Sequence, residues 1–112
     1  MLEIWETIDE FPNYKISNKG RVMNCTNYKL IRPFDDGRGY NVVHLYKDKI
    51  RYTKKIHRLV ADAFVEGKEE GYDVNHIDGN KKNNFAYNLE WCTRSENIKH
   101  AYYIGLFEKK GG

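Results

Sequence analysis

The sequence has few cysteines and no long apolar run, and each shortage excludes a class of protein. Its 112 residues contain two cysteines, Cys25 and Cys92, which lie far apart and form no C-x-x-C pair. A zinc ribbon is therefore not indicated, and a reduced, intracellular (cytoplasmic) chain is the simplest interpretation. Nothing approaches about 18 consecutive apolar residues, so no membrane span is predicted. The opening "MLEIWETIDEF" lacks the apolar stretch of a signal peptide, so none is expected.

The chain also lacks internal repeats and low-complexity tracts. Its hydrophobic content of 40% and aromatic content of 14% are typical of a globular protein rather than a disordered one. A chain of this length forms one domain, or a compact domain with a short appendage, and buries a modest core.

The net charge of +3 is small, but it is unevenly distributed. Residues 1–14 contain four acidic residues and no Lys or Arg, whereas residues 47–58 contain six Lys or Arg and a single acid, Asp48. A cationic stripe that includes Tyr52 suits a phosphate backbone. The alternative is a solvated face of a sheet, and charge alone does not separate the two.

The first half of the sequence predicts a small sheet. "YKISNKGRVMN" predicts two short strands around a turn at Gly20, and "KLIRP" is a candidate third strand before the loop "FDDGRG". "YNVVHLYKDKIRYTKKI" predicts a hairpin that turns near residues 47–49. We therefore expect residues 1–55 to form a β module that includes the basic hairpin.

The second half changes to a mixed pattern. Apolar residues from Ile56 to Phe64 recur at helical spacing, and Gly67 is a plausible stop. Extended segments are expected at "DVNHI" and "NLEWC". "TRSE" fits a capping box that opens a helix running to about Gly105, and the end "FEKKGG" should be frayed. The fold class predicted is therefore α+β, with strand, loop, strand and helix over the last third.

Asparagines are concentrated around one histidine in this last third. Asn75 precedes His76, Asn88 lies 12 residues beyond it, and Asn97 follows nine residues later in the first turns of the predicted helix. Asparagine is a poor former of both helices and strands, so such a cluster needs a reason. A hairpin packed on a helix can bring all four side chains to one cleft.

This segment, "VNHIDGNKKNNFAYNLEWCTRSENIKHA", resembles the HNH nucleases of phages and introns, the homing endonucleases with a ββα-metal (His-Me finger) motif. "WETIDEFPNYKISNKGRV" resembles the NUMOD4-like module often placed before that motif, and "IHRLVADAF" resembles the helix that joins them. The resemblance extends over about residues 4–105. It implies that residues 56–112 form the nuclease motif with its preceding helix, and that the two parts form one compact unit.

The resemblance also implies roles for individual residues. His76 is expected to be the general base that activates water, with Asn88 holding the loop and orienting it. Asn97 and Asn75 are expected to be metal ligands, although relatives often have Asp where this chain has Asn75. A neutral amide there implies weak metal binding before DNA supplies a phosphate. Asp78 and His100 are candidates to assist the site.

The chemistry of phosphodiester cleavage agrees with these expectations. Imidazole has a pKa of about 6.5, near the value that a general base needs at neutral pH. Mg²⁺ prefers oxygen ligands and is commonly held by few protein groups plus a substrate phosphate. We therefore expect one divalent ion per site, Mg²⁺ with Mn²⁺ as a substitute, and no small-molecule cofactor. The expected products are 5′-phosphate and 3′-hydroxyl ends, with one strand cut per site. A homodimer is left open as a route to a double-strand break.

The remaining polar residues have simpler explanations. Asn80, Asn83 and Asn84 are expected to form turns, Trp5 and Trp91 to belong to the core, and His44 to lie on the sheet. Candidates for contacts with the DNA backbone are Arg51, Lys54, Lys55, His57 and Arg58, with packing the alternative for His57.

Two other functions remain open. The first is a DNA-binding module that uses the basic hairpin and whose degenerate nuclease motif performs no chemistry. Asn75 keeps this alternative open, because it stands where relatives often have Asp. A structural role in a phage is disfavoured, because it gives no reason for the spacing of His76, Asn88 and Asn97. RNA is a less favoured substrate than DNA.

Overall fold

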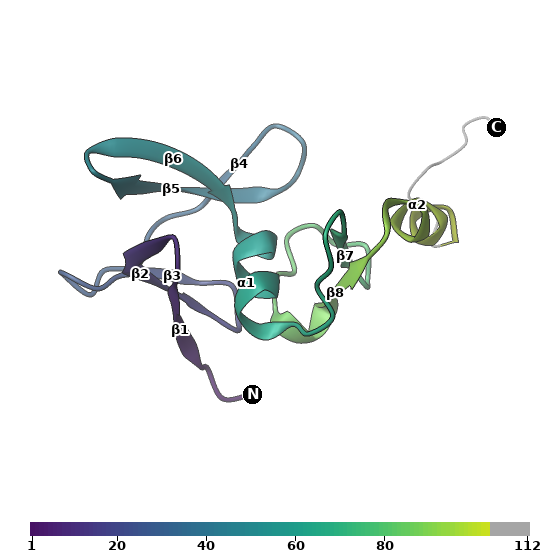
Figure 1. The fold of residues 1–112 in the computed structure, drawn as a ribbon, viewed down its shortest axis with the longest axis horizontal. Helices are drawn as coiled ribbons and strands as arrows, with labels where there is room; N and C mark the ends of the chain where they lie inside the picture. The colour runs from purple at the N-terminus through teal and green to yellow at the C-terminus, as the bar shows by residue number, and fades with distance from the viewer. Residues whose placement is uncertain (104–112) are drawn as a thin grey trace.

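In the computed structural model, which describes residues 1–103, three small antiparallel sheets surround one central helix, α1 (Ile56–Phe64) (Figure 1). The first sheet contains β1 (Trp5–Ile8), β2 (Phe11–Ser17) and β3 (Val22–Asn24). The second contains β4 (Phe34–Asp35), β5 (Asn41–Lys47) and β6 (Ile50–Lys55). This order of strands and helices confirms the predicted α+β class.

The third sheet pairs β7 (Asp73–His76) with β8 (Leu89–Cys92), and α2 (Arg94–Tyr103) follows directly. A loop that ends in the short 3₁₀ helix η1 (Ala86–Asn88) joins the two strands. β7, β8 and α2 therefore form the ββα arrangement that the sequence predicted. The predicted helix end near Gly105 and the frayed terminus lie outside the described residues.

One hydrophobic core joins the three sheets and α1. It contains Ile16 and Val22 from the first sheet, Val43 and Leu45 from the second, and Trp91 from the third, packed around buried residues of α1. The predicted apolar face of α1 is present, with Ile56 and Val60 fully buried. Because residues from both halves share this core, the sheets and the ββα unit hold one another in place.

The structure corrects the predicted strand at "KLIRP". Leu30 makes only an isolated bridge to Met23 and is 52% exposed, and Pro33 lacks the N–H that a ladder needs. Two short strands, β1 and β4, were not predicted; β4 falls in the segment expected to be a loop. The hairpin of β5 and β6 is as predicted and turns at Asp48 and Lys49, both with positive φ.

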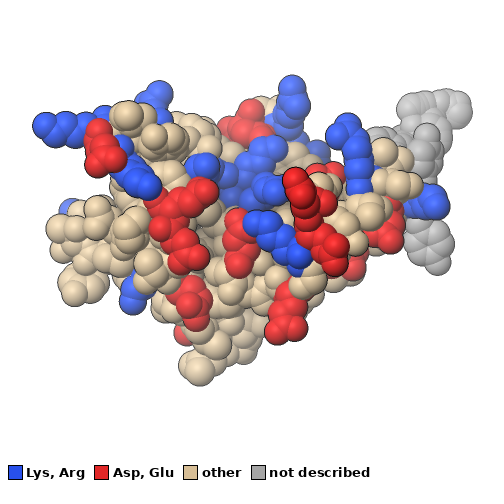
Figure 2. All heavy atoms as spheres, in the orientation of Figure 1, with Lys and Arg blue, Asp and Glu red and all other residues tan. Residues whose placement is uncertain are grey.

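Lys and Arg side chains gather on the upper part of the molecule in the view of Figure 2, above the junction of β6 and α1. Acidic side chains flank this group in the same view. Among the described residues, no helix is both long and apolar enough to cross a membrane.

Candidate active site

The ββα unit places Asn75, His76 and Asn97 around one cavity of about 290 Å³. Asn75 and His76 are consecutive residues at the end of β7, paired with Glu90 and Leu89 of β8, and Asn97 lies in the first turns of α2. Thr93 and Glu96 form the predicted capping box, each donating its backbone N–H to the other's side chain at 3.1 Å or less. This cap fixes the start of α2 and with it the position of Asn97.

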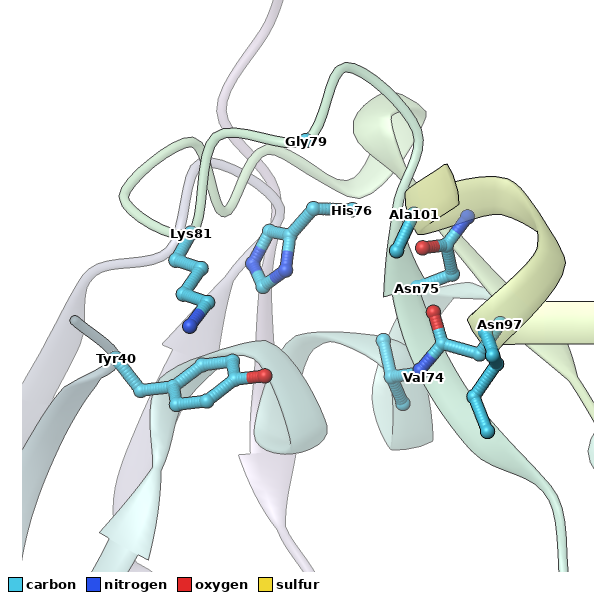
Figure 3. A pocket seen from close by; sticks show the side chains of 9 residues that line it. Tyr40, Val74, Asn75, His76, Gly79, Lys81, Asn97 and Ala101 are labelled. Atoms are coloured by element: carbon cyan, nitrogen blue, oxygen red, sulfur yellow. The ribbon is translucent and has the colours of Figure 1, made fainter. Parts of the chain in front are cut away.

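His76 is buried, with 6% of its surface exposed, and its ring lines the cavity (Figure 3). Its Nε2 lies 2.7 Å from Oδ1 of Asn84. Because an amide oxygen only accepts hydrogen bonds, this contact places the ring hydrogen on Nε2 and leaves a lone pair on Nδ1. Burial lowers the pKa of His76 and so favours the neutral ring, and the hydrogen bond to Asn84 offsets part of this effect. The His76 ring is therefore neutral near neutral pH, and a neutral imidazole can accept a proton as a general base.

Asn84 was expected to form a turn, and the structure gives it a different place. It is 5% exposed and, beyond its bond to His76, packs against the N-terminal sheet: a Cβ on Gly20 would lie 3.0 Å from that of Asn84. Next to this contact, the Ala86 N–H donates to the Asn18 carbonyl at 2.8 Å. The loop beside His76 is therefore supported by the N-terminal module.

Asn88 was expected to hold the loop and orient His76, and its hydrogen bonds are to Asp78 and Asn83 of the loop rather than to the His76 ring. Its amide donates to Asp78 Oδ1 and to the Asn83 carbonyl, and its oxygen accepts the Asp78 N–H. Asp78 also accepts from Asn83 and from the Asn80 N–H, and these bonds, led by the one from Asn83, lower its pKa. Asp78 thus serves the loop and is not among the residues that line the cavity.

Asn75 and Asn97 present amide oxygens to the cavity (Figure 3). Asn75 is 6% exposed, and its amide nitrogen donates to Glu90 Oε2 at 2.8 Å. Since the nitrogen is held by Glu90, the oxygen is turned toward Asn97. Two amide oxygens that face one space are the kind of ligand that a hard cation prefers. Within residues 1–103, no three His, Cys, Asp or Glu side chains lie close enough to hold a metal ion.

The other histidines have packing or bridging contacts. His57, a candidate for DNA contact, is 6% exposed and lies between Tyr40, stacked at 4.9 Å between ring centroids, and His76, at 5.0 Å. Burial, with nearby positive charge, lowers the pKa of His57 to about 3, so it carries no charge near neutral pH. His100 donates Nε2 to the Ile77 carbonyl at 2.8 Å and links α2 to the loop. His44 contacts Thr53 on the hairpin.

The basic residues of β6 divide between its two faces. Arg51 and Lys55 are exposed on one face, and Arg58 is exposed on the first turn of α1. Lys54 lies on the other face, 3.7 Å from Glu10 and over the ring of Phe11. Lys54 is therefore directed at the N-terminal sheet rather than at the cavity.

Sequence reasoning missed four residues of this site. Asn84 and Glu90 orient His76 and Asn75, and Tyr40 and Lys81 form a wall of the cavity, with the Lys81 Nζ 4.7 Å from the centre of the Tyr40 ring. Glu90 was recoverable, because strand pairing sets it opposite Asn75. Tyr40 was not, because it comes from a loop that only tertiary packing brings to the site.

Comparisons with known proteins agree with this geometry. The sequence profile of the NUMOD4 motif matches residues 3–46, and that of an HNH endonuclease matches residues 54–99. The chain is 41% identical over 98% of its length to the uncharacterized HNH endonuclease L245 of Acanthamoeba polyphaga mimivirus, and covers 34% of that protein. It is 38% identical over 86% of its length to the DNA endonuclease I-HmuI of Bacillus phage SP01, covering 56% of it.

The fold also matches a solved structure of the HNH homing endonuclease I-HmuI, which concerns DNA binding and cleavage by that protein. The TM-score is 0.88 and the identity 36%, over 95% of this chain and 62% of that one. The chain thus spans between about a quarter and three fifths of the proteins it resembles. The profiles, the relatives and the shared fold together show that this chain belongs to the HNH endonuclease family, with a NUMOD4 motif ahead of its HNH unit.

Proposed function

We propose that the chain is a metal-dependent DNA endonuclease whose single site hydrolyses one phosphodiester bond of one strand. The observation that carries this proposal is the cavity itself: a buried, neutral His76 on one wall and the amide oxygens of Asn75 and Asn97 on another. A phosphate seated between them has a base on one side and oxygen ligands for a cation on the other.

His76 acts as the general base in this proposal. Its Nδ1 accepts a proton from the water that attacks phosphorus, while Asn84 holds Nε2–H and fixes the ring. The bond from phosphorus to the 3′ oxygen breaks, and the products are a 5′-phosphate and a 3′-hydroxyl. Lys81, on the same cavity, offers a positive charge to the non-bridging oxygens of the phosphate.

Asn75 and Asn97 would hold one divalent cation, and the oxygen-only donor set favours Mg²⁺, with Mn²⁺ as a substitute. When bound, the ion supplies Lewis-acid stabilisation of charge on the leaving oxygen. Both ligands are neutral, so the DNA phosphate supplies the negative charge of the complete site. We therefore expect weak ion binding by the free protein and tighter binding with DNA present.

The test is a plasmid assay of wild type and His76→Ala with Mg²⁺, Mn²⁺ or EDTA. Wild type should convert supercoiled DNA to open circles only with a metal ion, and His76→Ala should be slower by roughly 10²–10⁴-fold. His44→Ala is the matched control, because His44 lies on the hairpin in contact with Phe34 and Thr53 and does not line the cavity. Equal rates for wild type and His76→Ala would remove the general-base role.

The remaining candidate is a binding module that performs no chemistry. The neutral Asn75 favours it, because relatives are expected to have a charged ligand at that position. Retardation of DNA on a gel, with no open circles under any ion, would establish this alternative in place of the nuclease.

A further inference from the structure

We propose that a second pocket, beside the His76 cavity, binds the DNA phosphate next to the one that is cleaved. The pocket has a volume of about 400 Å³, and its basic lining residues are Arg38, Lys55, Arg58 and Arg94. We call it the flanking-phosphate pocket. The inference rests on the proposed function, and it adds a substrate subsite with its own residues.

The two cavities are contiguous. Four residues line both cavities: Tyr40, Val74, Asn97 and Ile98. A DNA strand that leaves one cavity therefore enters the other beside Asn97. Successive phosphates of one strand are a single nucleotide apart, with a rise of about 3.4 Å per nucleotide. A strand whose cleaved phosphate lies beside His76 must therefore place a neighbouring phosphate close by.

Four cations from three separate segments converge on this pocket. Arg38 comes from the loop between β4 and β5, Lys55 and Arg58 from the junction of β6 and α1, and Arg94 from the first residue of α2. All four are exposed, and none forms an ion pair with a carboxylate within the described residues. The pocket also contains one acid, Asp73, so the balance is strongly positive.

Neighbouring aromatic rings hold two of these cations. The Lys55 Nζ lies 4.7 Å from the centre of the Tyr40 ring, which itself stacks on buried His57, and the Arg58 guanidinium carbon lies 5.7 Å from the centre of Trp91. Lys81 connects the two cavities, since its Nζ donates to the Arg38 carbonyl at 3.0 Å while its side chain lines the His76 cavity.

This chemistry selects a phosphate rather than a base or an apolar group. An arginine guanidinium can donate two parallel hydrogen bonds to the oxygens of one phosphate, and three arginines line this pocket. The four cations outnumber the single carboxylate, Asp73, so the lining favours an anion over a neutral nucleobase. The cationic stripe predicted over residues 47–58 thus reaches this pocket through Lys55 and Arg58, and the remaining charge comes from Arg38 and Arg94.

The test compares two probes, thymidine 3′,5′-bisphosphate and thymidine 5′-monophosphate, titrated into the protein and followed by NMR. The bisphosphate carries two phosphates at the spacing of one nucleotide, and it should bind more tightly than the monophosphate. Arg94→Ala or Arg58→Ala should weaken binding of the bisphosphate by roughly 10-fold, as expected for the loss of a charged hydrogen bond to a phosphate.

Arg51→Ala is the matched control, because it removes the same charge from the hairpin, away from the pocket. Equal weakening by Arg51→Ala and Arg94→Ala would mean that only overall charge matters, and would overturn the proposal. So would a bisphosphate that binds no better than the monophosphate. These probes are not cleaved, so the result is independent of whether His76→Ala abolishes nicking.

Discussion

At the scale of single residues, the site depends on how two amides are held. The amide nitrogen of Asn75 donates to the Glu90 carboxylate, and this bond turns the Asn75 oxygen into the cavity. A carboxylate at position 75 would instead face the Glu90 carboxylate across the same short distance. Asn75 and Glu90 are therefore matched, and the neutral residue at position 75 is explained by its partner on β8.

The first prediction exchanges the charge between these two residues. Asn75→Asp alone should lower stability by about 1–2 kcal/mol, because two carboxylates would be opposed in the sheet. Asn75→Asp combined with Glu90→Gln should restore stability and bind Mn²⁺ more tightly than wild type, since one ligand is then charged. Thermal unfolding and calorimetric titration with Mn²⁺ measure the two effects. A single variant as stable as wild type would show that the bond to Glu90 does not hold Asn75.

The sequence could identify some of these residues and not others. The spacing of His76, Asn88 and Asn97 led us to expect all of these side chains in one cleft, whereas Asn97 lines the His76 cavity and Asn88 does not. Asn84 looked like one of several turn residues. Its burial depends on the contact with Gly20, which belongs to a distant segment, so no local pattern shows it.

At the scale of elements, the N-terminal sheet supports the loop of the active site. The turn between β2 and β3 touches this loop twice, through Gly20 against Asn84 and through the Asn18 carbonyl, which accepts the Ala86 N–H. Asn18 is itself fixed, because its side chain bonds the backbone at Ile4 and Leu2. The N-terminal module is thus part of the structure that positions His76.

Gly20→Ala tests this support. Gly20 has a φ of +84°, and its new Cβ would lie 3.0 Å from the Asn84 Cβ. We expect a loss of about 1–2 kcal/mol of stability and slower nicking, because Asn84 would shift away from His76. Gly37→Ala is the control: its φ is +93°, but its Cβ would meet nothing within 4 Å. Equal nicking by the two variants, measured where both are folded, would exclude the support.

Elements with strong local signals were predicted well. The β5–β6 hairpin, α1, the β7–β8 pair and the cap of α2 each have a periodic pattern or a turn within the segment itself. β1 and β4 were missed because they are short, with four and two residues, although each pairs with the next strand along the chain. "KLIRP" had the composition of a strand and lies beside β3, but it makes only the isolated bridge between Leu30 and Met23.

At the scale of the whole molecule, two histidines are buried side by side among positive charges. His57 is in contact with Tyr40 and His76, and Lys55, Arg58 and Asp36 are the nearby charged groups. The core that joins the sheets to the ββα unit includes Ile56 and Val60 on either side of this histidine in α1. The protonation of His57 is therefore coupled to the folding of the entire domain.

The last prediction follows from the pKa of His57, which is about 3 in the folded protein and 6.5 when the ring is exposed. Above pH 6.5 the ring is neutral in both states. As the pH falls from 6.5 toward 3, the unfolded chain binds a proton at His57 that the folded chain does not bind. The free energy of unfolding therefore decreases, by roughly 3 kcal/mol at pH 4. His57→Phe keeps the stack on Tyr40 and should flatten this decrease. Urea unfolding between pH 7 and pH 4 measures it, and parallel curves for the two proteins would show that other groups cause the loss.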